Sequence, residues 1–444
     1  MLAINYKLPA RNFWGGIHPE DSKTSTHTKK IQNLLPPKKA IIPLQQHTGA
    51  LCKPIVNIGD IVKVGQKIGD AQAFISAPVH ATISGKIVDI SPMPHPLGTK
   101  VLSIIIESDG TDSWAIEEIK RDWETLEPEQ IKYIVQEAGV VGLGGAMFPT
   151  HVKLSPTENK KIDIYILNGA ECEPFLTADH RLMLEYAKQV VIGLKILMKA
   201  TGVKKSIIGI EQNKPDALKK IADEINKESD LDIDITVLKV KYPQGAEKQL
   251  IKALLKREVP SGGLPMDVGA IVSNVGTSFA VYESVVERKP LVERIVTVTG
   301  GGIRNPQNLR VRIGTPFSNL IEACGGVKEE IGKIIMGGPM MGIAQHTTDV
   351  PVIKGTSGIL VQTKDEVCDK PEECCIRCGN CANVCPMKIL PNVITNSIKN
   401  DQFEHAKEYG LLDCMECGAC TYVCPAHIPI VQYMKYGKTQ LRKF

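Results

Sequence analysis

The sequence predicts a multidomain protein in which a β segment, an α/β domain and a second β segment precede a small cysteine-rich domain. Three observations support this fold class. The chain has 444 residues, more than the roughly 250–300 at which a single hydrophobic core stops growing. Strand-like and helix-like hydrophobic patterns alternate between 160 and 260, which is typical of a layered α/β domain with a largely parallel sheet. Eight of the thirteen cysteines lie between residues 375 and 424.

The composition is that of a soluble protein and indicates neither nucleic-acid binding nor a membrane-spanning segment. The net charge is only +4 and no dense block of Lys and Arg occurs, so nucleic acid is not expected to bind. The longest apolar stretch, "VVIGLKILM" at 190–198, is interrupted by Lys195 and is far shorter than the roughly 20 residues that cross a bilayer. The N-terminus lacks the pattern of a signal peptide. We therefore expect a cytoplasmic protein with no transmembrane segment of its own.

The first two segments differ in pattern. Residues 1–29 are polar and irregular, which predicts an extended N-terminal arm. Residues 30–107 alternate short β-prone runs, such as "IIPL" and "KVLSIIIE", with Gly, Asp and Pro turns, and they predict a small β domain. The hydrophobic period of "EPEQIKYIVQEAG" predicts a helix over 127–139 that ends at Gly139.

The middle of the chain predicts an α/β domain over 125–290. Its strands are expected in "KIDIYILN", "KSIIGIE" and "IDITVLKV", and its helices in "HRLMLEYAKQVVIGLKILMKA", "KPDALKKIADEINKE" and "AEKQLIKALLKR". Residues 291–362 return to β character with "RIVTVTGGG" and "KIIMGGPMMG", and they predict a further β domain. The cysteines occupy the last domain, 363–444.

Two cysteine-rich segments form an internal repeat. "CIRCGNCANVCPMKI" (375–389) and "CMECGACTYVCPAHI" (414–428) share one pattern and are offset by 39 residues, from 375 to 414. The spacing C-x2-C-x2-C-x3-C-P is that of bacterial ferredoxins, which bind 4Fe–4S clusters. Isolated C-x2-C pairs would suit structural zinc equally well. Two complete runs, each with its proline, favour two 4Fe–4S clusters.

In two-cluster ferredoxins the fourth cysteine of each run ligates the other cluster. One cluster is therefore expected on Cys375, Cys378, Cys381 and Cys424, and the second on Cys414, Cys417, Cys420 and Cys385. The linker between the runs reads as helices, which indicates a helical ferredoxin variant. Cys374 does not fit the spacing of the first run, and Cys52, Cys324 and Cys368 have no second cysteine at metal-binding spacing. No ligand role is expected for these four residues.

A glycine-rich stretch, "GVVGLGGAMFPTHVKL" at 139–154, is a candidate cofactor loop. Such a loop, followed by a helix, lets backbone N–H groups approach a phosphate closely. No strand is expected directly before it, so it is not the turn of a Rossmann domain. Taken alone the loop is weak evidence, because many glycine clusters only make turns.

The loop gains weight from the stretches that follow it, "LNGAECEPFLTADHR" (167–181), "YPQGAEKQL" (242–250) and "IVSNVGTSFAVYE" (271–283). Together they resemble the NADH-binding flavoprotein subunit of respiratory complex I, with its motifs G-x-G-G-A-x-F-P-T-x-x-K, N-A-D-E-S-E-P, G-E-E and N-N-V-E-T. In that family these loops hold FMN and, stacked on it, the nicotinamide of NADH.

The resemblance implies a site residue by residue. FMN would be held by Gly142, Gly144, Gly145, Lys153, Asn168, Glu171, Cys172, Gly245, Glu247, Asn274 and Thr277. NADH would meet Gly145, Ala146, Phe148, Glu173 and Glu247, of which Gly145, Phe148 and Glu247 are the expected catalytic positions. The chain departs from the family at Leu143, Ala170, Ala246 and Ser273, which replace an arginine, an aspartate, a glutamate and an asparagine. Because no loop offers a Ser/Thr acceptor motif, a non-covalent flavin is expected.

Over residues 13 to 435 the chain resembles the C subunit of the Rnf electron-transport complex. "FWGGIHP", "HTGALCKPIVNIGDIVKVGQKIGDAQAFISAPVHATISGK", "VTGGGIRNP", "GGPMMG" and the two cysteine runs carry this resemblance. That family couples NADH oxidation to ferredoxin reduction through a membrane-bound ion pump. The resemblance implies an NADH-oxidising enzyme subunit that docks on the cytoplasmic face of the membrane through the other Rnf subunits and reaches ferredoxin indirectly.

The two β segments also resemble known domains. Residues 30–107 are similar to the barrel-sandwich fold of lipoyl carriers, and "SAPVHATISG" would put His80 at the tip where a carrier presents its lysine. We expect this domain to be structural. Residues 291–362 are similar to the β-grasp domain that follows the flavin domain in complex I. Docking surfaces are expected on the N-terminal arm, on the domain of His80 and on the cluster domain with its basic tail "KYGKTQLRKF".

Two other functions fit the same modules. A soluble reductase of the cobalamin-reductase type would deliver electrons to another acceptor. A ferredoxin-like relay would have kept the flavin fold without a flavin. Flavin absorption that bleaches on addition of NADH separates the relay from both enzymes.

Overall fold

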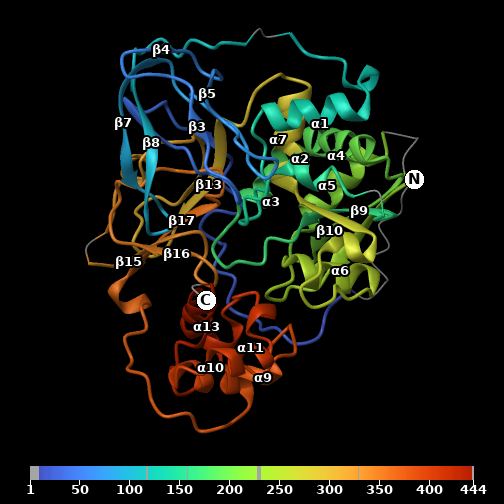
Figure 1. Cartoon of the computed structure of the whole chain (residues 1–444), viewed down its shortest axis with the longest axis vertical. Coiled ribbons are helices and arrows are strands. Elements are labelled where there is room, and N and C mark those ends of the chain that lie inside the picture. Colours follow the sequence, from blue (N-terminus) through green and yellow to red (C-terminus); the bar gives the residue numbers. More distant parts are fainter. Residues whose placement is uncertain (1–9, 117–118, 158, 228–231, 329, 443–444) are drawn as a thin grey trace.

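A computed structural model of the chain describes residues 10–442 apart from 117–118, 158, 228–231 and 329. Figure 1 shows four parts: a β domain at the upper left, a second β domain below it, an α/β domain at the right, and a helical C-terminal domain at the bottom. The predicted order of domain types along the chain is therefore the observed one. Across the described ranges, no helix combines the length and apolar character that a membrane crossing requires.

The first β domain consists of two small antiparallel sheets that share one core. One sheet has the order β2 (Lys39–Pro43), β8 (Lys100–Ser108), β7 (Gly85–Pro94) and β4 (Ile61–Val62), and the other β3 (Lys53–Pro54), β5 (Lys67–Asp70) and β6 (Val79–His80). The placement of His80 at an exposed tip is wrong. His80 pairs with Lys67 across β5 and β6 and is only 6% exposed, and burial lowers its pKa to about 3.

The α/β domain contains the predicted parallel sheet. Its strand order is β11 (Asp232–Leu238), β10 (Lys205–Glu211), β9 (Ile164–Gly169) and β12 (Ala270–Asn274). Its helices are α1 (Pro128–Glu137), α2 (Thr150–Lys153), α3 (Ala178–Glu185), α4 (Ala187–Thr201), α5 (Pro215–Ile225), α6 (Glu247–Leu255) and α7 (Val275–Val285). The helix expected at 180–200 is two helices, because the backbone leaves helical geometry at Tyr186, whose ring packs on Phe279.

Both faces of this sheet are buried, which explains its apolar strands. In β9, Tyr165 and Leu167 face the core formed with helices α1, α3, α4, α5 and α7, whereas Ile164 and Ile166 face the core formed with α6. The chain leaves β9 for β10 and β11 on one side and then returns to β12 on the other. Ligands of such sheets bind where the strand order reverses, at the carboxyl ends of the strands, here between β9 and β12.

The second β domain is built on a six-stranded mixed sheet. The order is β1 (Gln32–Asn33), β14 (Gln307–Arg312), β13 (Glu293–Thr299), β17 (Gly358–Thr363), β15 (Ile331–Met336) and β16 (Ile343–Gln345). The helix α8 (Phe317–Ala323) packs its Phe317 and Leu320 into the core. The edge strand β1 comes from the N-terminal part of the chain and pairs in parallel with β14.

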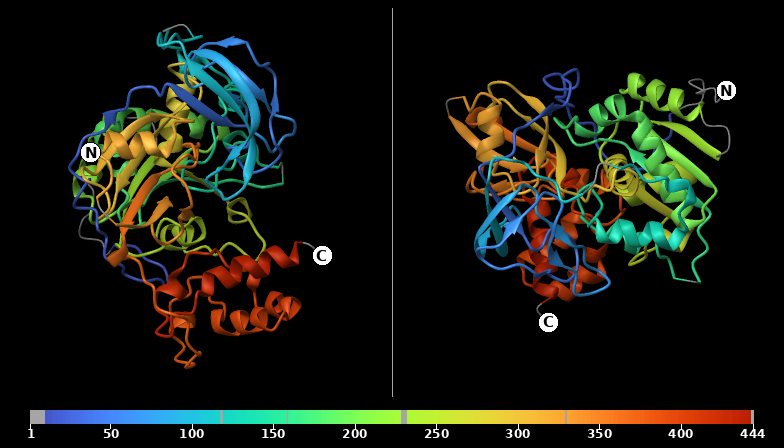
Figure 2. Two further views of the ribbon diagram at one scale, coloured as in Figure 1. Left: turned by 90° about the vertical axis from the view of Figure 1, so that its left-hand side faces the viewer. Right: turned by 90° about the horizontal axis from the view of Figure 1, so that it is seen from above.

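The described part of the N-terminal arm, residues 10–29, packs along the rest of the chain and is not a free extension; a docking surface on it stays a prediction. Figure 2 shows it as a dark blue segment along the α/β domain toward the C-terminal domain. Backbone N–H groups of Arg11, Gly16 and Ile17 donate to the carbonyls of Val237, Val384 and Tyr242 at 2.9, 2.7 and 2.8 Å. The arm therefore connects three of the four domains.

The C-terminal domain is helical, as predicted. It contains α9 (Asn380–Asn383), α10 (Pro391–Lys399), α11 (Phe403–Glu408), α12 (Ala419–Tyr422) and α13 (Ile430–Leu441). The linker between the two cysteine runs forms α10 and α11. The apolar core of the domain includes Ile394, Ile398 and Met434 together with Cys381 and Cys420. Cysteines of both runs are therefore part of the core that holds this domain together.

Candidate functional site

The glycine-rich loop lies at the carboxyl end of the parallel sheet. Its base is fixed, because Gly142 N–H donates to the Phe148 carbonyl at 2.8 Å and Leu143 N–H donates to Thr277 Oγ1 at 2.9 Å. Its tip, Gly144 to Ala146, is exposed. Gly145 has φ +119°, and a Cβ there would meet no atom within 4 Å. The loop therefore presents open backbone to the space in front of it.

Two further loops approach each other beside it. Asn168 Nδ2 donates to the Gly245 carbonyl at 2.8 Å, and Gly245 N–H donates to Cys172 Sγ at 3.3 Å. A Cβ at Gly245 would lie 2.4 Å from the Ala170 carbonyl oxygen. Only glycine permits this approach, so the loops after β9 and β11 form one continuous wall.

The donor groups around the loop fit a phosphate. Lys153 Nζ lies 3.0 Å from Glu247 Oε2 and donates to the Val272 carbonyl at 3.1 Å. Asn274 caps α7, and its Nδ2 donates to Asp179 Oδ2 at 2.6 Å. A cation, an amide and the N–H groups of the loop are the groups that bind phosphate at helix and loop termini. The structure thus brings the predicted flavin residues of the four motifs together.

In the structure, Glu171 and Glu173 both contact the N-terminal arm through Lys23. Glu171 accepts from the N–H groups of Asp179 and His180 at 2.9 and 3.3 Å and lies 3.9 Å from Lys23 Nζ. Lys23 is 7% exposed, and its Nζ also donates to the carbonyls of Glu171, Glu173 and Leu176. Sequence reasoning missed Lys23, because it resembles the other polar residues of the arm.

Glu173 joins the α/β domain to the second β domain. Its carboxylate accepts from Met340 N–H at 3.2 Å and from Met341 N–H at 2.9 Å. These two residues belong to the "GGPMMG" stretch between β15 and β16. Burial raises the pKa of Glu173 to about 7.

The raised pKa of Glu173 predicts a pH-dependent stability. Its ordinary value is 4.5, so its contribution to folding is fully present below that pH and is lost as pH rises through about 7. Glu173→Gln stays neutral, and its unfolding midpoint should fall less than that of the wild type over this interval. Thermal melts at a series of pH values measure this, with the exposed Glu258→Gln as the control. Parallel pH profiles for wild type and Glu173→Gln would contradict the prediction.

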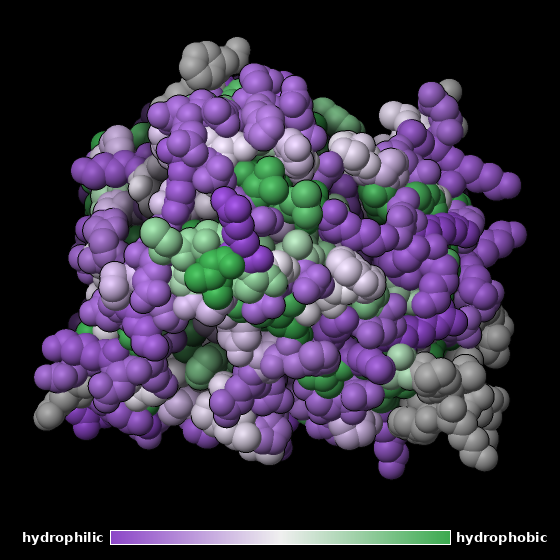
Figure 3. Space-filling model, turned by 90° about the horizontal axis from the view of Figure 1, so that it is seen from below, coloured by the Kyte–Doolittle hydropathy of each residue, from purple (hydrophilic) through white to green (hydrophobic). Residues whose placement is uncertain are grey.

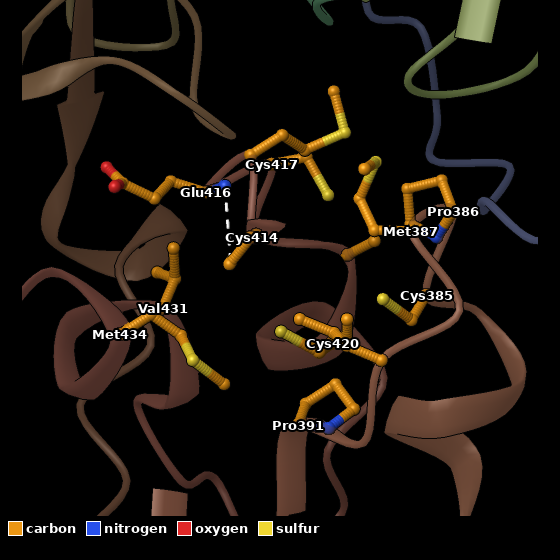
Figure 4. Close-up of a pocket in the computed structure, with 14 residues that line it drawn as sticks. Cys385, Pro386, Met387, Pro391, Cys414, Glu416, Cys417, Cys420, Val431 and Met434 are labelled. Atoms are coloured by element: carbon orange, nitrogen blue, oxygen red, sulfur yellow. Dashed lines mark hydrogen bonds between the residues drawn. The ribbon is translucent and has the colours of Figure 1, made fainter. Parts of the chain in front are cut away.

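Four cysteines, Cys385, Cys414, Cys417 and Cys420, lie on the side of the C-terminal domain that faces the α/β domain, and we call them the near cysteine set. Figure 4 shows these four side chains around a common space, with Val431 and Met434 on one side. Glu416 N–H donates to Cys414 Sγ at 3.4 Å. Burial raises the pKa of each of the four thiols, so thiolates at this place require a compensating positive charge such as iron.

The outer cysteine set consists of Cys375, Cys378, Cys381 and Cys424. It lines a second cavity. Cys375 and Cys378 are exposed. Each cavity thus combines three cysteines of one run with the fourth cysteine of the other. Of the cysteines for which no ligand role is expected, Cys374 and Cys368 are exposed, and Cys52 and Cys324 are buried.

The repeat seen in the sequence is also present in the backbone. Positive φ angles recur at corresponding positions of the two runs: +57° and +59° at Arg377 and Glu416, +77° at Gly379 and Gly418, and +58° and +50° at Lys388 and His427. Four of these six residues are not glycine, although this conformation is unfavourable for them. Such strain is expected where a backbone must turn its N–H groups toward a bound group.

The donor sets fit clusters better than single ions. Within the described ranges, no three His, Cys, Asp or Glu side chains lie close enough together to hold one metal ion. The four thiols of each set instead surround a cavity. Ligands of a 4Fe–4S cluster stand around several iron atoms, whereas those of zinc converge on one point. The geometry therefore favours the iron–sulfur interpretation.

The near cysteine set lies against the flavin-domain loops. Tyr242 Oη donates to the Cys417 carbonyl at 2.7 Å. Tyr242, Cys417 and Ala419 form a small apolar cluster, against which Cys172 and Met340 pack. A Cβ at Gly418 would lie 3.0 Å from the Met340 carbonyl oxygen. Tyr242 and Met340 lie in stretches singled out from the sequence, but no local pattern revealed that they contact the cysteine domain.

Fold and site together define an electron-transfer protein that combines a flavin-binding α/β domain with a two-cluster iron–sulfur domain. Four family models match the chain: the RnfC barrel sandwich hybrid domain at residues 11–111, the Nuo51 FMN-binding domain at 135–283, the SLBB domain at 295–344, and the 4Fe-4S dicluster domain at 369–425. These matches confirm the predicted fold class and its FMN and 4Fe–4S cofactors.

The chain belongs to the RnfC family, the C subunits of ion-translocating ferredoxin:NAD(+) oxidoreductase complexes. It is 52% identical over 437 residues to the C subunit of the proton-translocating complex of Clostridium ljungdahlii, covering 97% of this chain and 94% of the relative. It is 48% identical over 432 residues to the C subunit of the Na(+)-translocating complex of Acetobacterium woodii, with 97% of each covered. The C subunit of the ion-translocating oxidoreductase complex of Rhodobacter capsulatus is 42% identical, with coverages of 99% and 85%.

A solved structure shares the fold at low identity. A crystal structure of an NAD+-reducing [NiFe]-hydrogenase in the air-oxidized state superposes with a TM-score of 0.53 and 18% identity. The match covers 73% of this chain and 63% of that chain. This likeness supports the domain architecture alone.

Proposed function

We propose that the chain is the NADH-oxidising electron-input subunit of an ion-translocating ferredoxin:NAD(+) oxidoreductase complex. When bound, FMN would take a hydride from NADH and pass electrons singly to two 4Fe–4S clusters. The other subunits of the complex would be its partners, and ferredoxin would be reached through them. The names of the relatives that match over nearly their whole length support this assignment.

The chain's own residues would bind and orient the reactants. Lys153, Asn274, Thr277 and the N–H groups of the glycine-rich loop would hold the FMN phosphate, and the loops of Asn168, Glu171, Cys172 and Gly245 would border its ring. Gly145, Ala146, Phe148 and Glu247 would face NADH. Glu173 would act mainly through Met340 and Met341, which its carboxylate binds, and only secondarily on the nucleotide.

One observation carries the proposal: the near cysteine set is in contact with the flavin-domain loops. The hydrogen bond from Tyr242 to Cys417 joins the two. The outer set lies beyond it, with Cys375 and Cys378 exposed. The order is therefore flavin loops, near set, outer set and protein surface, which suits electron transfer between NADH and a partner.

The outer set marks the proposed docking face. Figure 3 views the molecule from below, with the C-terminal domain toward the reader, and apolar side chains gather at the middle of this face among polar ones. Ile376, Leu412 and Tyr422 of this domain are 69%, 59% and 57% exposed. This face would meet the membrane-bound subunits at the cytoplasmic side, as a peripheral contact.

The test is a titration of the full chain purified anaerobically. It should show flavin absorption that bleaches on addition of NADH, and acid precipitation should release FMN to the supernatant. With NADH it should reduce ferricyanide, but it should not reduce ferredoxin, since that uphill step needs the ion gradient of the complete complex. A protein without flavin would support the relay instead. Robust NADH-to-ferredoxin transfer by the lone chain would refute the proposed function.

Glu247→Gln is expected to slow NADH oxidation and to leave the FMN content near that of the wild type. The carboxylate begins α6 and pairs with Lys153 at 3.0 Å, so the variant keeps the shape of the site and removes one negative charge. Stopped-flow flavin bleaching should slow by about tenfold, a typical loss for one positioned group. Glu258→Gln, an exposed carboxyl, is the control. Loss of FMN from Glu247→Gln would make its role structural.

A further inference from the structure

We infer that Thr395 donates a hydrogen bond to the cluster bound by the outer cysteine set, and that this bond helps to give the outer cluster a higher reduction potential than the near cluster. The inference rests on the proposed function, in which both clusters carry electrons. The potential of a 4Fe–4S cluster depends on the hydrogen bonds that its sulfurs accept. The two cysteine sets are related by the internal repeat, but they differ in these donors.

The internal repeat extends beyond the cysteine runs into the helix that follows each of them. The first residues of α10 and α13, 391 and 430, show the same offset of 39 residues as the runs. Asn392 and Thr395 of α10 line the outer cavity. The corresponding residues of α13, Val431 and Met434, line the near cavity (Figure 4). Two positions that are apolar beside the near set are therefore polar beside the outer set.

Thr395 carries a buried hydroxyl group without a partner. The residue is 4% exposed, and among the described residues no group forms a hydrogen bond with its Oγ1. Ser397 in the same helix shows the usual arrangement, because its Oγ donates to the Val393 carbonyl at 3.1 Å. A buried hydroxyl that lacks an acceptor is costly. The sulfurs of a cluster in the cavity that Thr395 lines supply the missing acceptor.

A backbone donor differs between the two sets in the same sense. Burial raises the pKa of the Cys381 thiol, and a hydrogen bond from Asn392 N–H opposes this rise. The corresponding N–H beside the near set, that of Val431, donates instead to Thr421 Oγ1 at 3.0 Å. The first run has Ala382 at the position of Thr421, and alanine has no hydroxyl. The outer set therefore keeps an N–H donor to sulfur that the near set has lost to Thr421.

The nearest lysines do not separate the two sets. Lys399 and Lys438 occupy corresponding positions of the repeat and pair with Glu372 and Glu416, respectively. The hydroxyl and N–H donors of the outer set place partial positive charge beside its sulfurs, which stabilises the more negative, reduced cluster. An electron shared by the two clusters is therefore held mainly at the outer set, next to the protein surface.

The test is a dithionite titration of the full-length protein with its clusters bound, followed by electron paramagnetic resonance. Thr395→Val keeps the branched shape and removes the hydroxyl. It should change the redox equilibrium of the outer cluster tenfold, which lowers its midpoint potential by about 59 mV for a one-electron couple, and should leave the near cluster unchanged. Thr395→Ser should restore the wild-type value. Cys378→Ser, which removes an outer ligand, identifies the outer signal. The control is Ser397→Ala, which removes a neighbouring hydroxyl that already has a partner.

An unchanged outer midpoint in Thr395→Val, or equal shifts of both signals, overturns the inference. A wild-type outer midpoint below the near one also overturns it. If Thr395→Val loses the outer cluster, Met434→Thr adds a hydroxyl at the corresponding near position and should raise the near midpoint; a near midpoint that does not rise then counts against the inference. Dithionite reduces the clusters without the flavin, so a failure of NADH to bleach the flavin refutes the proposed function alone.

Discussion

Cys385→Ser should abolish or strongly alter the cluster on Cys414, Cys417 and Cys420 and leave the cluster on the other run intact. Cys385 lies in the first run, but its side chain lines the cavity of the second. Serine cannot supply the thiolate that the cluster needs. Electron paramagnetic resonance of the reduced protein should therefore lose one of two signals, and the iron content should fall.

Matched variants make this test decisive. Cys374→Ser changes the exposed neighbour of the first run and should leave both signals unchanged. Cys424→Ser is the reciprocal variant and should disturb the cluster of the first run, because Cys424 lines the outer cavity. Loss of only the first-run signal in Cys385→Ser would exclude the crossed arrangement.

Lys214→Met should cost about 3–5 kcal/mol of the free energy of unfolding. Lys214 Nζ lies 2.5 Å from Glu211 Oε2, and the two side chains are 2% and 1% exposed. Removing the cation leaves a carboxylate buried at the carboxyl end of β10 without its partner. The expected loss is a large share of the roughly 5–15 kcal/mol that keeps a domain folded. Urea denaturation followed by circular dichroism measures it.

Two further variants help to interpret this result. Lys205→Met breaks an exposed pair, with Lys205 46% exposed and 3.4 Å from Asp234, and should cost no more than about 1 kcal/mol. The double variant Lys214→Met with Glu211→Leu removes both charges and should recover most of the lost stability. Equal losses in the free energy of unfolding for Lys214→Met and Lys205→Met would show that the buried ion pair contributes no more to stability than the exposed one.

The features predicted correctly are those that depend on neighbours in sequence. The strand of Tyr165 and Leu167 is apolar on both faces because helices cover both sides of a parallel sheet, and the run can be read directly. Cysteine spacing is equally local, since one tight turn must present three sulfurs to one cluster. The assignment of Cys385 and Cys424 to crossed clusters, taken from two-cluster ferredoxins, stays a prediction.

The features missed depend on partners far away in the chain. Lys23 is buried by the carbonyls of Glu171, Glu173 and Leu176, and nothing around it in the sequence is apolar enough to show this. Glu173 likewise finds its N–H donors at Met340 and Met341. Local patterns report the hydrophobic period of one element, and they carry no information about which remote backbone groups still need partners.

The N-terminal arm has a consequence for the way the chain is made. Domains generally fold as units while synthesis proceeds from the N-terminus. The arm leaves the ribosome first, yet its Thr26 carbonyl accepts from Asn308 of β14 and its Gly16 N–H donates to the Val384 carbonyl. The first residues made must therefore wait for some of the last before they reach their native partners. A ribosome-stalled chain that ends before β14 would leave the arm open to protease, whereas the released full-length protein would protect it.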